Sequence, residues 1–544
     1  MFSWFHSSPS YTATNEAVLG YEAGSPERKE LEEKIKFYDS QVHDVPIVVG
    51  DEEIRNNDVR YQVRPFDHQN KLAKYYYADK GVLEKAIKVS QEAHSAWERV
   101  PLEEKSDIFL RAADLVSGKY RMDLLASTML GQAKNIMQAE IDAACELADF
   151  YRFNVEFGLN AQKWQPISTQ ESNNRMILRG MEGFWAAIAP FNFTAISGHL
   201  AGAPAFMGNV VLWKSSDTAM LSSYICYKIL REAGVPSGVI NFVPADGPVF
   251  GNAVCGSPLL AGINFTGSAK TFHHLWQEVA KNITNYKSFP RLIGECGGKN
   301  FHFVHPTANL QSVVYGSLRS AFEYSGQKCS ALSRMYVPES CWDTVREGLT
   351  EEHKNMKLGS PLEADSFLSA VIDGASFNRI KGYLEHAKSS PNVKIIAGGE
   401  CDDSQGYYVQ PTILQTTDPN EKLMQEEIFG PILTVYVYKD AEYKSVLKLI
   451  DQTSPYSLTG AIYADDPAVL KEASEALRFS AGNFYVNDKS TGSVVSQQPF
   501  GGARKSGTND KAGGPHYLLK FTSPQSIKTT SVPASRWDYP YMSS

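Results

Sequence analysis

A run of thirty residues without Asp, Glu, Lys or Arg, FWAAIAPFNFTAISGHLAGAPAFMGNVVLW, occupies Phe184–Trp213. Its length would suit a membrane span. Pro190, Asn192, His199 and Pro204 interrupt the run, however, and they would leave polar groups unsatisfied in lipid. The stretch therefore predicts core segments of a parallel sheet together with the helix that covers it.

Short apolar runs and helical segments alternate from this stretch onward. The predicted strands are Phe184–Ala189, Val210–Lys214, Val239–Pro244, Gly262–Thr266 and Leu292–Glu295. The predicted helices are Ala195–Met207, Thr218–Ala233, Phe250–Cys255 and Ser268–Ile283. Strands that alternate with helices form a mostly parallel sheet covered by helices.

A second series of the same kind follows. Its helices are predicted at Leu310–Tyr324, Trp342–Met356 and Phe377–Ser389. Its strands are predicted near Met335–Pro338, Val393–Ala397, Ile432–Tyr438, Gly460–Tyr463 and Asn483–Val486. The sequence therefore predicts an α/β protein with two tandem parallel-sheet domains, whose ligands would bind near the carboxyl ends of strands.

The segments outside these two series have other sequence patterns. Residues before Asp51 are expected to lead into the body through a charged helix at Pro26–Lys36, and amphipathic helices are predicted at Val82–Val100 and Ser106–Leu130. Two polar, strand-like stretches have no helical partner, namely Gln162–Leu178 and roughly Thr508–Trp537. They are either arms that pair with another subunit or exposed edge strands of one domain.

Composition excludes several classes of protein. Hydrophobic residues make up 43% and charged residues 21%, as in ordinary globular proteins and unlike disordered chains. The net charge is -8 and no run of five Lys or Arg occurs, which argues against nucleic acid as a partner. Seven cysteines without a C-x-x-C spacing predict neither a disulfide framework nor a zinc site, and we expect no bound metal.

Two short stretches suggest chemistry by themselves. Phe265–Ser268 ends a predicted strand and begins a helix, so its free amides could meet a pyrophosphate, although Ser268 could equally be an ordinary helix cap. Cys329 lies in a small, polar turn just beyond an amphipathic helix, where a thiol is accessible. Such a thiol attacks only if its surroundings favour the thiolate.

These two stretches belong to a set of seven motifs that occur in a fixed order along the chain. They are WAAIAPFNF at Trp185–Phe193, LWK at Leu212–Lys214, FTGS at Phe265–Ser268, GECGGK at Gly294–Lys299, GQKC at Gly326–Cys329, EEIFGP at Glu426–Pro431 and PFGG at Pro499–Gly502. Together they resemble the aldehyde dehydrogenase superfamily over roughly Ile47–Thr522.

The resemblance implies a nucleophilic cysteine. Cys329 would attack an aldehyde, and the Asn192 amide and the Cys329 backbone N–H would hold the oxyanion of the thiohemiacetal. After hydride transfer to the cofactor, Glu295 would activate water to hydrolyse the thioester. Cys296 departs from the commonest superfamily pattern, and we expect it to be a buried packing residue because it ends a predicted strand.

The resemblance also implies a nicotinamide cofactor, NAD. Lys214 would bind the adenosine ribose, Gly267 and Ser268 the pyrophosphate, and Glu427 the nicotinamide ribose, while Phe429 would pack beside the nicotinamide. The sequence leaves NADP open, because Lys214 could also meet a 2′-phosphate.

Wider stretches resemble the members of this family that oxidise L-glutamate γ-semialdehyde. These stretches are Phe184–Trp213, Gly294–His305, Arg319–Tyr324, Asn487–Ser493 and Gln497–His516. By resemblance, Gly492, Ser493 and Ser330 would bind the substrate carboxylate, and Phe193 and Phe500 would enclose its aliphatic chain. The alternative is another small semialdehyde such as succinate semialdehyde.

The resemblance further implies a division of the chain, an assembly and a compartment. Residues 1–46 would lead in, residues 47–161 and 179–293 would bind NAD, residues 294–507 would form the catalytic domain, and residues 162–178 and 508–544 would form an oligomerisation arm and tail. A homo-oligomer, a dimer or larger, in the mitochondrial matrix is expected. Met1–Asn15 is rich in Ser and Thr without acidic residues, as presequences are, but it also lacks Arg.

Overall fold

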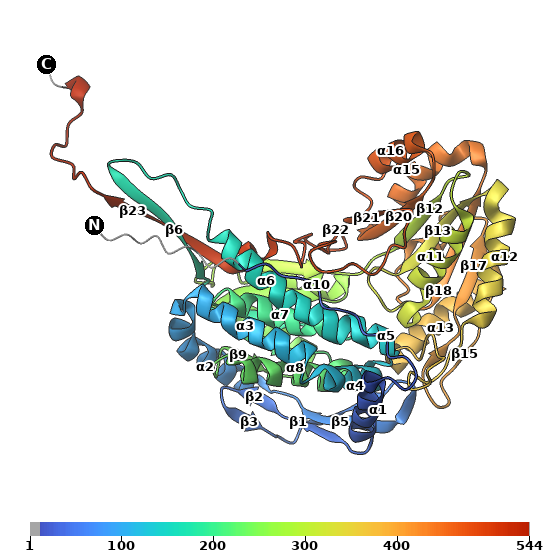
Figure 1. Ribbon diagram of the computed structural model, residues 1–544, viewed down its shortest axis with the longest axis horizontal. Helices are drawn as coiled ribbons and strands as arrows, with labels where there is room; N and C mark the ends of the chain where they lie inside the picture. Colours follow the sequence, from blue (N-terminus) through green and yellow to red (C-terminus); the bar gives the residue numbers. More distant parts are fainter. Residues whose placement is uncertain (1–10, 543–544) are drawn as a thin grey trace.

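The computed structural model of the protein describes residues 11–542, and two seven-stranded sheets form its frame. Figure 1 shows the first sheet with its helices at the lower left and the second sheet at the right. Two α/β units with largely parallel sheets confirm the predicted fold class. Within residues 11–542, no helix is long and apolar enough to cross a membrane.

The first sheet has five parallel strands, and two short strands extend it on one side, each antiparallel to its neighbour in the order below. Their order is β11 (Arg291–Glu295), β10 (Leu260–Thr266), β7 (Phe184–Ile188), β8 (Val210–Lys214), β9 (Ile240–Phe242), β2 (Ile47–Val49) and β3 (Glu52–Ile54). The helices that follow its strands are α7 (Thr194–Phe206), α8 (Met220–Ala233), α9 (Gly247–Gly256) and α10 (Ala269–Lys281). The uncharged run is thus β7, α7 and β8, which are buried almost throughout, as its composition predicts.

The segment before β7 is mainly helical. Its helices are α1 (Pro26–Asp39), α2 (Lys80–Arg99), α3 (Leu102–Ser117), α4 (Arg121–Gln132), α5 (Ile136–Ala139), the π-helical turn η1 (Glu140–Glu146) and α6 (Leu147–Ala161). A small sheet is formed by β1 (His43–Val45), β5 (Asp67–Tyr76) and β4 (Val59–Arg64). The prediction of one helix over Ser106–Leu130 is wrong, because the chain leaves helical geometry at Gly118 and starts again at Arg121.

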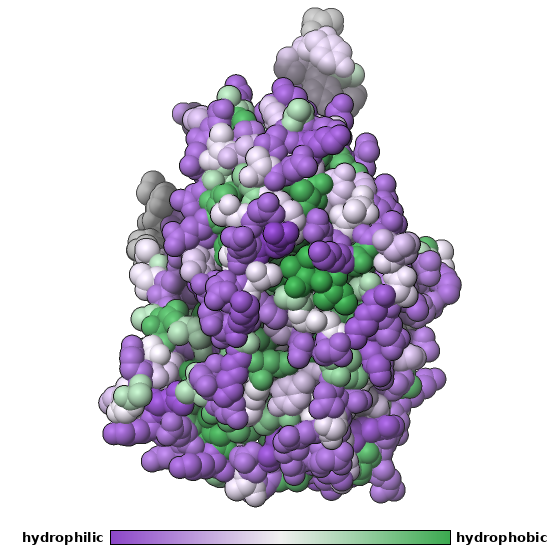
Figure 2. Space-filling view, turned by 90° about the vertical axis from the view of Figure 1, so that its right-hand side faces the viewer, coloured by the Kyte–Doolittle hydropathy of each residue, from purple (hydrophilic) through white to green (hydrophobic). Residues whose placement is uncertain are grey.

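The second sheet is parallel except at one edge. Its order is β14 (Val393–Ala397), β17 (Thr412–Thr416), β18 (Ile432–Tyr438), β13 (Leu332–Pro338), β12 (Asn300–Val304), β20 (Thr459–Tyr463) and β21 (Asn483–Val486), with β14 antiparallel to β17. Its main helices are α11 (Leu310–Phe322), α12 (Glu339–Asn355), α13 (Gly374–Ser389), α15 (Tyr443–Thr453) and α16 (Pro467–Ala476). The side that carries α12 and α13 is mostly hydrophilic, with a compact hydrophobic area near its centre (Figure 2).

The two polar stretches pair with each other. β6 (Ser172–Gly180) and β23 (Thr522–Thr530) form one antiparallel ribbon that extends away from the body (Figure 1). Each strand therefore satisfies the facing edge of the other inside one chain. The two outer edges of the ribbon have no partner strand within the described residues. Residues 1–10, most of the presequence-like stretch, lie outside the described residues.

Candidate active site

The carboxyl ends of four parallel strands meet at one edge of the first sheet. The strand register sets Thr266 opposite Glu295, Phe265 opposite Ile188, and Ile188 opposite Lys214. The chain order reverses between β7 and β10, and such a switch point opens a crevice for a ligand. Asn192, Lys214, Gly267, Ser268 and Glu295 all lie at or just beyond these strand ends.

A cavity of about 420 Å³ lies at this edge and has the elements of a dinucleotide site. Its lining includes Asn192, Gly267, Ser268, Cys329, Glu427 and Phe429. Ser268 is the N-cap of α10, with its hydroxyl accepting the Thr271 N–H at 3.1 Å. The cap and the phosphate site are compatible, because the helix dipole and the remaining amides still face the cavity end.

Glu427 and Phe429 are held in fixed positions at this cavity. Glu427 accepts the Gly298 N–H at 3.0 Å, and a Cβ atom at Gly297 would collide with the Glu427 carboxylate. Burial raises the pKa of Glu427 to about 7. Phe429 has a left-handed backbone (φ 53°), a conformation that costs free energy in a non-glycine residue and marks functional sites. Its ring meets Phe191 edge-on at 5.8 Å.

Lys214 is the exception among the predicted cofactor residues. It ends β8 at the same edge, but it is not among the residues that line this cavity. Its ammonium group donates to the Ser215 carbonyl at 3.4 Å, and burial lowers its pKa.

The turn Tyr324–Gln327 before Cys329, which we call the nucleophile turn, is held in an unusual conformation. Tyr324, Ser325 and Gly326 are consecutive left-handed residues (φ 53°, 53° and 67°). A Cβ atom at Gly326 would collide with the Gly430 carbonyl, so only glycine fits there. The Gln327 side chain accepts the Ile372 N–H at 2.9 Å, which ties the turn to the segment before α13.

Two amide side chains hold the backbone on either side of Cys329. Asn300, at the start of β12, donates to the Cys329 carbonyl at 2.7 Å and to the Ala331 carbonyl at 2.8 Å. Asn192 is buried and donates to the Gln327 carbonyl at 3.1 Å, which brings its amide beside the nucleophile turn. Sequence reasoning missed Asn300, although it directly follows the GECGGK motif.

The electrostatic surroundings of Cys329 favour the neutral thiol in this state. Burial raises the pKa of Cys329, and the charges of Glu295 and Glu427 raise it further. Burial also raises the pKa of Glu295, to about 8, with Asp510 adding to the effect. A carboxyl group with such a pKa can take up and release protons near neutral pH. Cys296 is buried, as expected, and burial raises the pKa of its thiol to about 12.

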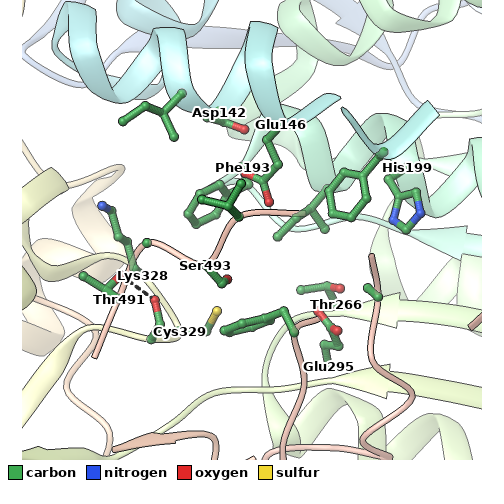
Figure 3. Close-up of a pocket in the computed structure, with 18 of the residues that line it drawn as sticks. Asp142, Glu146, Phe193, His199, Thr266, Glu295, Lys328, Cys329, Thr491 and Ser493 are labelled. Atoms are coloured by element: carbon green, nitrogen blue, oxygen red, sulfur yellow. Dashed lines mark hydrogen bonds between the residues drawn. The ribbon is translucent and has the colours of Figure 1, made fainter. Parts of the chain in front are cut away.

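A second cavity of about 300 Å³ lies on the other side of Cys329. The predicted residues that line it are Phe193, Glu295, Cys329, Ser330, Gly492, Ser493 and Phe500. Figure 3 shows the Cys329 sulfur and Ser493 pointing into the same space, with Phe193 and Glu146 on the opposite wall. Cys329 lines both cavities, so one thiol faces the space for a cofactor and the space for a substrate.

We call the loop Ser490–Gln498 the substrate loop. Its first two residues are fixed by hydrogen bonds to the body of the second unit. Ser490 hydrogen-bonds with His302 at 3.1 Å and with Ser320 at 2.9 Å. The Ser330 and Thr491 hydroxyls share a hydrogen bond of 2.7 Å, drawn in Figure 3. Gly492 follows in a left-handed conformation (φ 87°), which suits a turn that presents backbone amides to an anion.

Charges of both signs line the substrate cavity, and sequence reasoning gave them no role. The acids are Asp142, Glu146 and Glu323, and the bases are Arg319, Lys328 and Lys489. Lys328 and Arg319 both pair with Glu323, at 2.9 and 2.8 Å. Glu146 projects from η1 into the cavity (Figure 3), and burial raises its pKa well above the usual range. In the sequence, Glu146 is an acid within a helical stretch, and such a residue cannot be told from one on a solvent-exposed helix face.

Asp142 and Lys134 form a buried support behind this wall. Lys134 donates to Asp142 at 2.8 Å and lies 4.0 Å from the centre of the Phe193 ring. Asp142 also accepts the N–H groups of Thr194 and Ala195, both at 2.9 Å, at the start of α7. Phe193 is thereby held between a fixed backbone and a fixed cation.

Comparisons with known proteins agree with this geometry. The profile of the aldehyde dehydrogenase family matches residues 55–527. The chain is 60% identical to delta-1-pyrroline-5-carboxylate dehydrogenase, mitochondrial, of Danio rerio (97% of this chain, 95% of that protein) and 58% identical to that of Homo sapiens (99% and 96%). The crystal structure of the Mycobacterium tuberculosis delta-pyrroline-5-carboxylate dehydrogenase bound with NAD is similar at a TM-score of 0.94 and 44% identity, covering 98% of each chain. The chain therefore belongs to the aldehyde dehydrogenase family.

Proposed function

We propose that the protein oxidises L-glutamate γ-semialdehyde, which is in equilibrium with 1-pyrroline-5-carboxylate, to L-glutamate with NAD. The observation that carries this proposal is the position of Cys329 between a dinucleotide-shaped cavity and a cavity lined by both charge signs. The names of the relatives support the substrate, and the NAD-bound relative supports the cofactor. Both relatives are named mitochondrial, which supports a mitochondrial setting, and the reaction would there serve proline catabolism in the matrix.

The chain's own residues divide the reaction between them. Cys329 first loses its thiol proton to solvent. The thiolate then adds to the aldehyde carbon, and the Asn192 amide with the Cys329 N–H stabilises the resulting oxyanion. NAD, when bound at the first cavity, would supply the acceptor for the hydride that leaves this carbon. Glu295 then takes a proton from water, the water attacks the thioester carbonyl, and Cys329 leaves as the thiolate with glutamate as product.

The residues at the first cavity match the parts of NAD. Ser268 and the Gly267 backbone would meet the pyrophosphate, Glu427 the nicotinamide ribose, and Phe429 the nicotinamide ring. Lys214, at the same sheet edge, would reach the adenosine ribose. Gly297 supports this arrangement, since the Glu427 carboxylate occupies the space that a Cβ atom there would need.

The charges of the second cavity match an amino-acid head group. Gly492, Ser493 and Ser330 would bind the α-carboxylate, with Lys328 and Lys489 supplying positive potential nearby. Glu146, which points into this cavity, would accept hydrogen bonds from the α-ammonium group. Phe193 and Phe500 would enclose the methylene groups. Succinate semialdehyde, the alternative substrate, has the carboxylate but not the ammonium group.

The test is steady-state NADH formation by the purified protein. We expect kcat/KM for glutamate semialdehyde to exceed that for succinate semialdehyde and for propionaldehyde, and NAD to be preferred to NADP. A higher kcat/KM for succinate semialdehyde would favour the alternative. An absence of NADH formation with every aldehyde would overturn the proposal.

The same proposal extends to domains and assembly. Residues 47–161 and 179–293 would form the NAD-binding domain, residues 294–507 the catalytic domain, and residues 162–178 and 508–544 the arm and tail. The outer edge of β23, which has no partner strand within residues 11–542, supports a homodimer or a larger assembly. A monomeric mass in solution at micromolar concentration would contradict the assembly.

A further inference from the structure

An extended segment near the N-terminus crosses the outside of the substrate cavity. Residues 13–21, which we call the strap, contain no helix or strand, and in Figure 1 they run as a dark blue trace along α6 toward α5 and α1. The Tyr21 hydroxyl donates to the buried Glu140 carboxylate at 2.7 Å, and the Leu19 N–H donates to the same carboxylate at 2.9 Å. One end of the strap is therefore fixed to η1.

The middle of the strap is fixed by charge. The Glu16 carboxylate pairs with Arg121 at 2.9 Å and with Arg152 at 2.6 Å, and the Glu16 N–H donates to Asp149 at 2.7 Å. Arg121 and Arg152 are both largely buried. Pairs of this kind are stronger than exposed surface pairs, because water screens them less. The strap is therefore held to α4 and α6 independently of the substrate loop.

Asn15 connects this fixed strap to the substrate loop. Its amide nitrogen donates to the Asp149 carboxylate at 2.8 Å and to the Val495 carbonyl at 3.0 Å. Its amide oxygen accepts from the Gln497 side chain at 3.0 Å. Val495 lies two residues beyond Ser493, so a single side chain joins α6 of the first unit to the loop of the second.

The strap also contributes to the cavity itself. Val18 lines the same cavity as Cys329 and Ser493, although its side chain is 52% exposed. The loop that the strap touches is irregular, and Ser496 within it has a left-handed backbone (φ 69°). Such a loop needs contacts along its whole length to stay in one conformation. Its start is held by the hydrogen bonds of Ser490 and Thr491, which leaves residues 494–498 to be held by other contacts.

We propose that residues 15–18 of the strap form part of the outer wall of the substrate site and that Asn15 is a positioning residue for the substrate loop. Asn15 does not touch the reacting atoms; it holds Val495 and Gln497 so that Gly492 and Ser493 present their groups to the substrate carboxylate. This inference rests on the proposed function, because it assigns the specificity for a carboxylate-bearing aldehyde partly to the N-terminal segment.

The test compares Asn15→Ala with Tyr21→Phe in the full chain. Asn15→Ala removes the bridge to the loop, so we expect KM for glutamate semialdehyde to rise about ten-fold. Its kcat, and kcat/KM for propionaldehyde, should stay within two-fold of the unmodified protein. Tyr21→Phe removes a strap contact that is remote from the loop, and we expect it to leave both substrates within two-fold even where it lowers Tm.

The partner residue gives an independent check. Gln497→Ala should raise KM for glutamate semialdehyde less than Asn15→Ala does, and the double variant should be no worse than Asn15→Ala alone. Equal losses on both aldehydes, or an unchanged KM in Asn15→Ala, would overturn the inference.

Amide hydrogen exchange separates this inference from the proposed function. Exchange in residues 490–498 should be faster in Asn15→Ala than in Tyr21→Phe, with no substrate present. If the unmodified protein fails to oxidise glutamate semialdehyde, the proposed function fails, whereas unchanged exchange in Asn15→Ala overturns the strap's role whatever the substrate.

Discussion

The two cavities that meet at Cys329 are built in different ways. The cofactor side consists of strand ends, the first turn of α10 and glycines, all within a regular sheet. The substrate side collects side chains from η1, α7, the nucleophile turn, the substrate loop and the strap. A sheet edge can serve many family members that share a cofactor, whereas irregular segments can change independently to suit one aldehyde.

Replacing Cys329 should abolish the reaction in which both cavities take part. Cys329→Ala removes the covalent step, so we expect aldehyde oxidation to fall by on the order of ten-thousand-fold or more. NAD binding, measured as a rise in Tm with added NAD, should persist because the sheet edge is untouched. Normal turnover by this variant would point to Cys296 instead.

Replacing Glu295 should separate the two half-reactions. Glu295→Gln keeps the shape but cannot take a proton from water, so we expect deacylation to slow about a hundred- to ten-thousand-fold. A rapid burst of NADH followed by a slow steady state would be seen in stopped-flow measurements. Equal loss of the burst and the steady state would mean that Glu295 acts before hydride transfer.

The pH dependence is the control for this assignment. The pKa of Glu295 is raised to about 8, and only the unprotonated carboxylate can accept a proton from water. Deacylation should therefore quicken as pH rises to about 8 and level off above it. In Glu295→Gln the slow release should lose this dependence, and a profile of unchanged shape would assign the titration to another group.

Ser493→Ala should affect the substrate side alone. The variant loses a hydrogen bond to a carboxylate, so kcat/KM for glutamate semialdehyde should fall about ten- to a hundred-fold. KM for NAD and oxidation of propionaldehyde, which has no carboxylate, should hardly change. If both aldehydes lose equally, the loop is structural.

Gly297→Ala is the matching change on the cofactor side. The new Cβ would collide with the Glu427 carboxylate and displace it, so we expect KM for NAD to rise about ten-fold. KM for the aldehyde should stay within two-fold. Gly256→Ala is a suitable control, because a Cβ atom there meets nothing within 4 Å. An unchanged KM for NAD would show that Glu427 does not hold the cofactor.

The fold could largely be predicted because its signals are local. The apolar runs that became β7, β8 and β10 are buried on both faces, so each reads as continuous hydrophobic sequence. β12 and β17 were missed: Asn300–Val304 follows β11 after only a short glycine-containing link, and Thr412–Thr416 mixes polar with apolar residues. The helix break at Gly118 was also missed, because the helical spacing of apolar residues continues on both sides of it.

In the candidate site, too, residues with a local sequence signal could be predicted and residues without one could not. The residues named from motifs gather around the two cavities, with Lys214 outside the lining of the first. Asn300, Glu146 and Asn15 had no signal of their own, since an amide or an acid at a strand end, in a helix or in a loop looks like any polar surface residue. Their roles arise from contacts between distant parts of the chain, such as Asn15 with Val495, which no spacing in the sequence encodes.

The β6–β23 ribbon constrains the order in which the protein can mature. Its strands come from distant parts of the chain, with Arg179 and Ser523 in contact across 344 positions. During synthesis β6 therefore emerges long before its partner exists, and until then both its edges are open to other strands. Folding that ends with a pairing of such high contact order is slow, so a chain cut short before Thr522 would carry a permanent aggregation hazard.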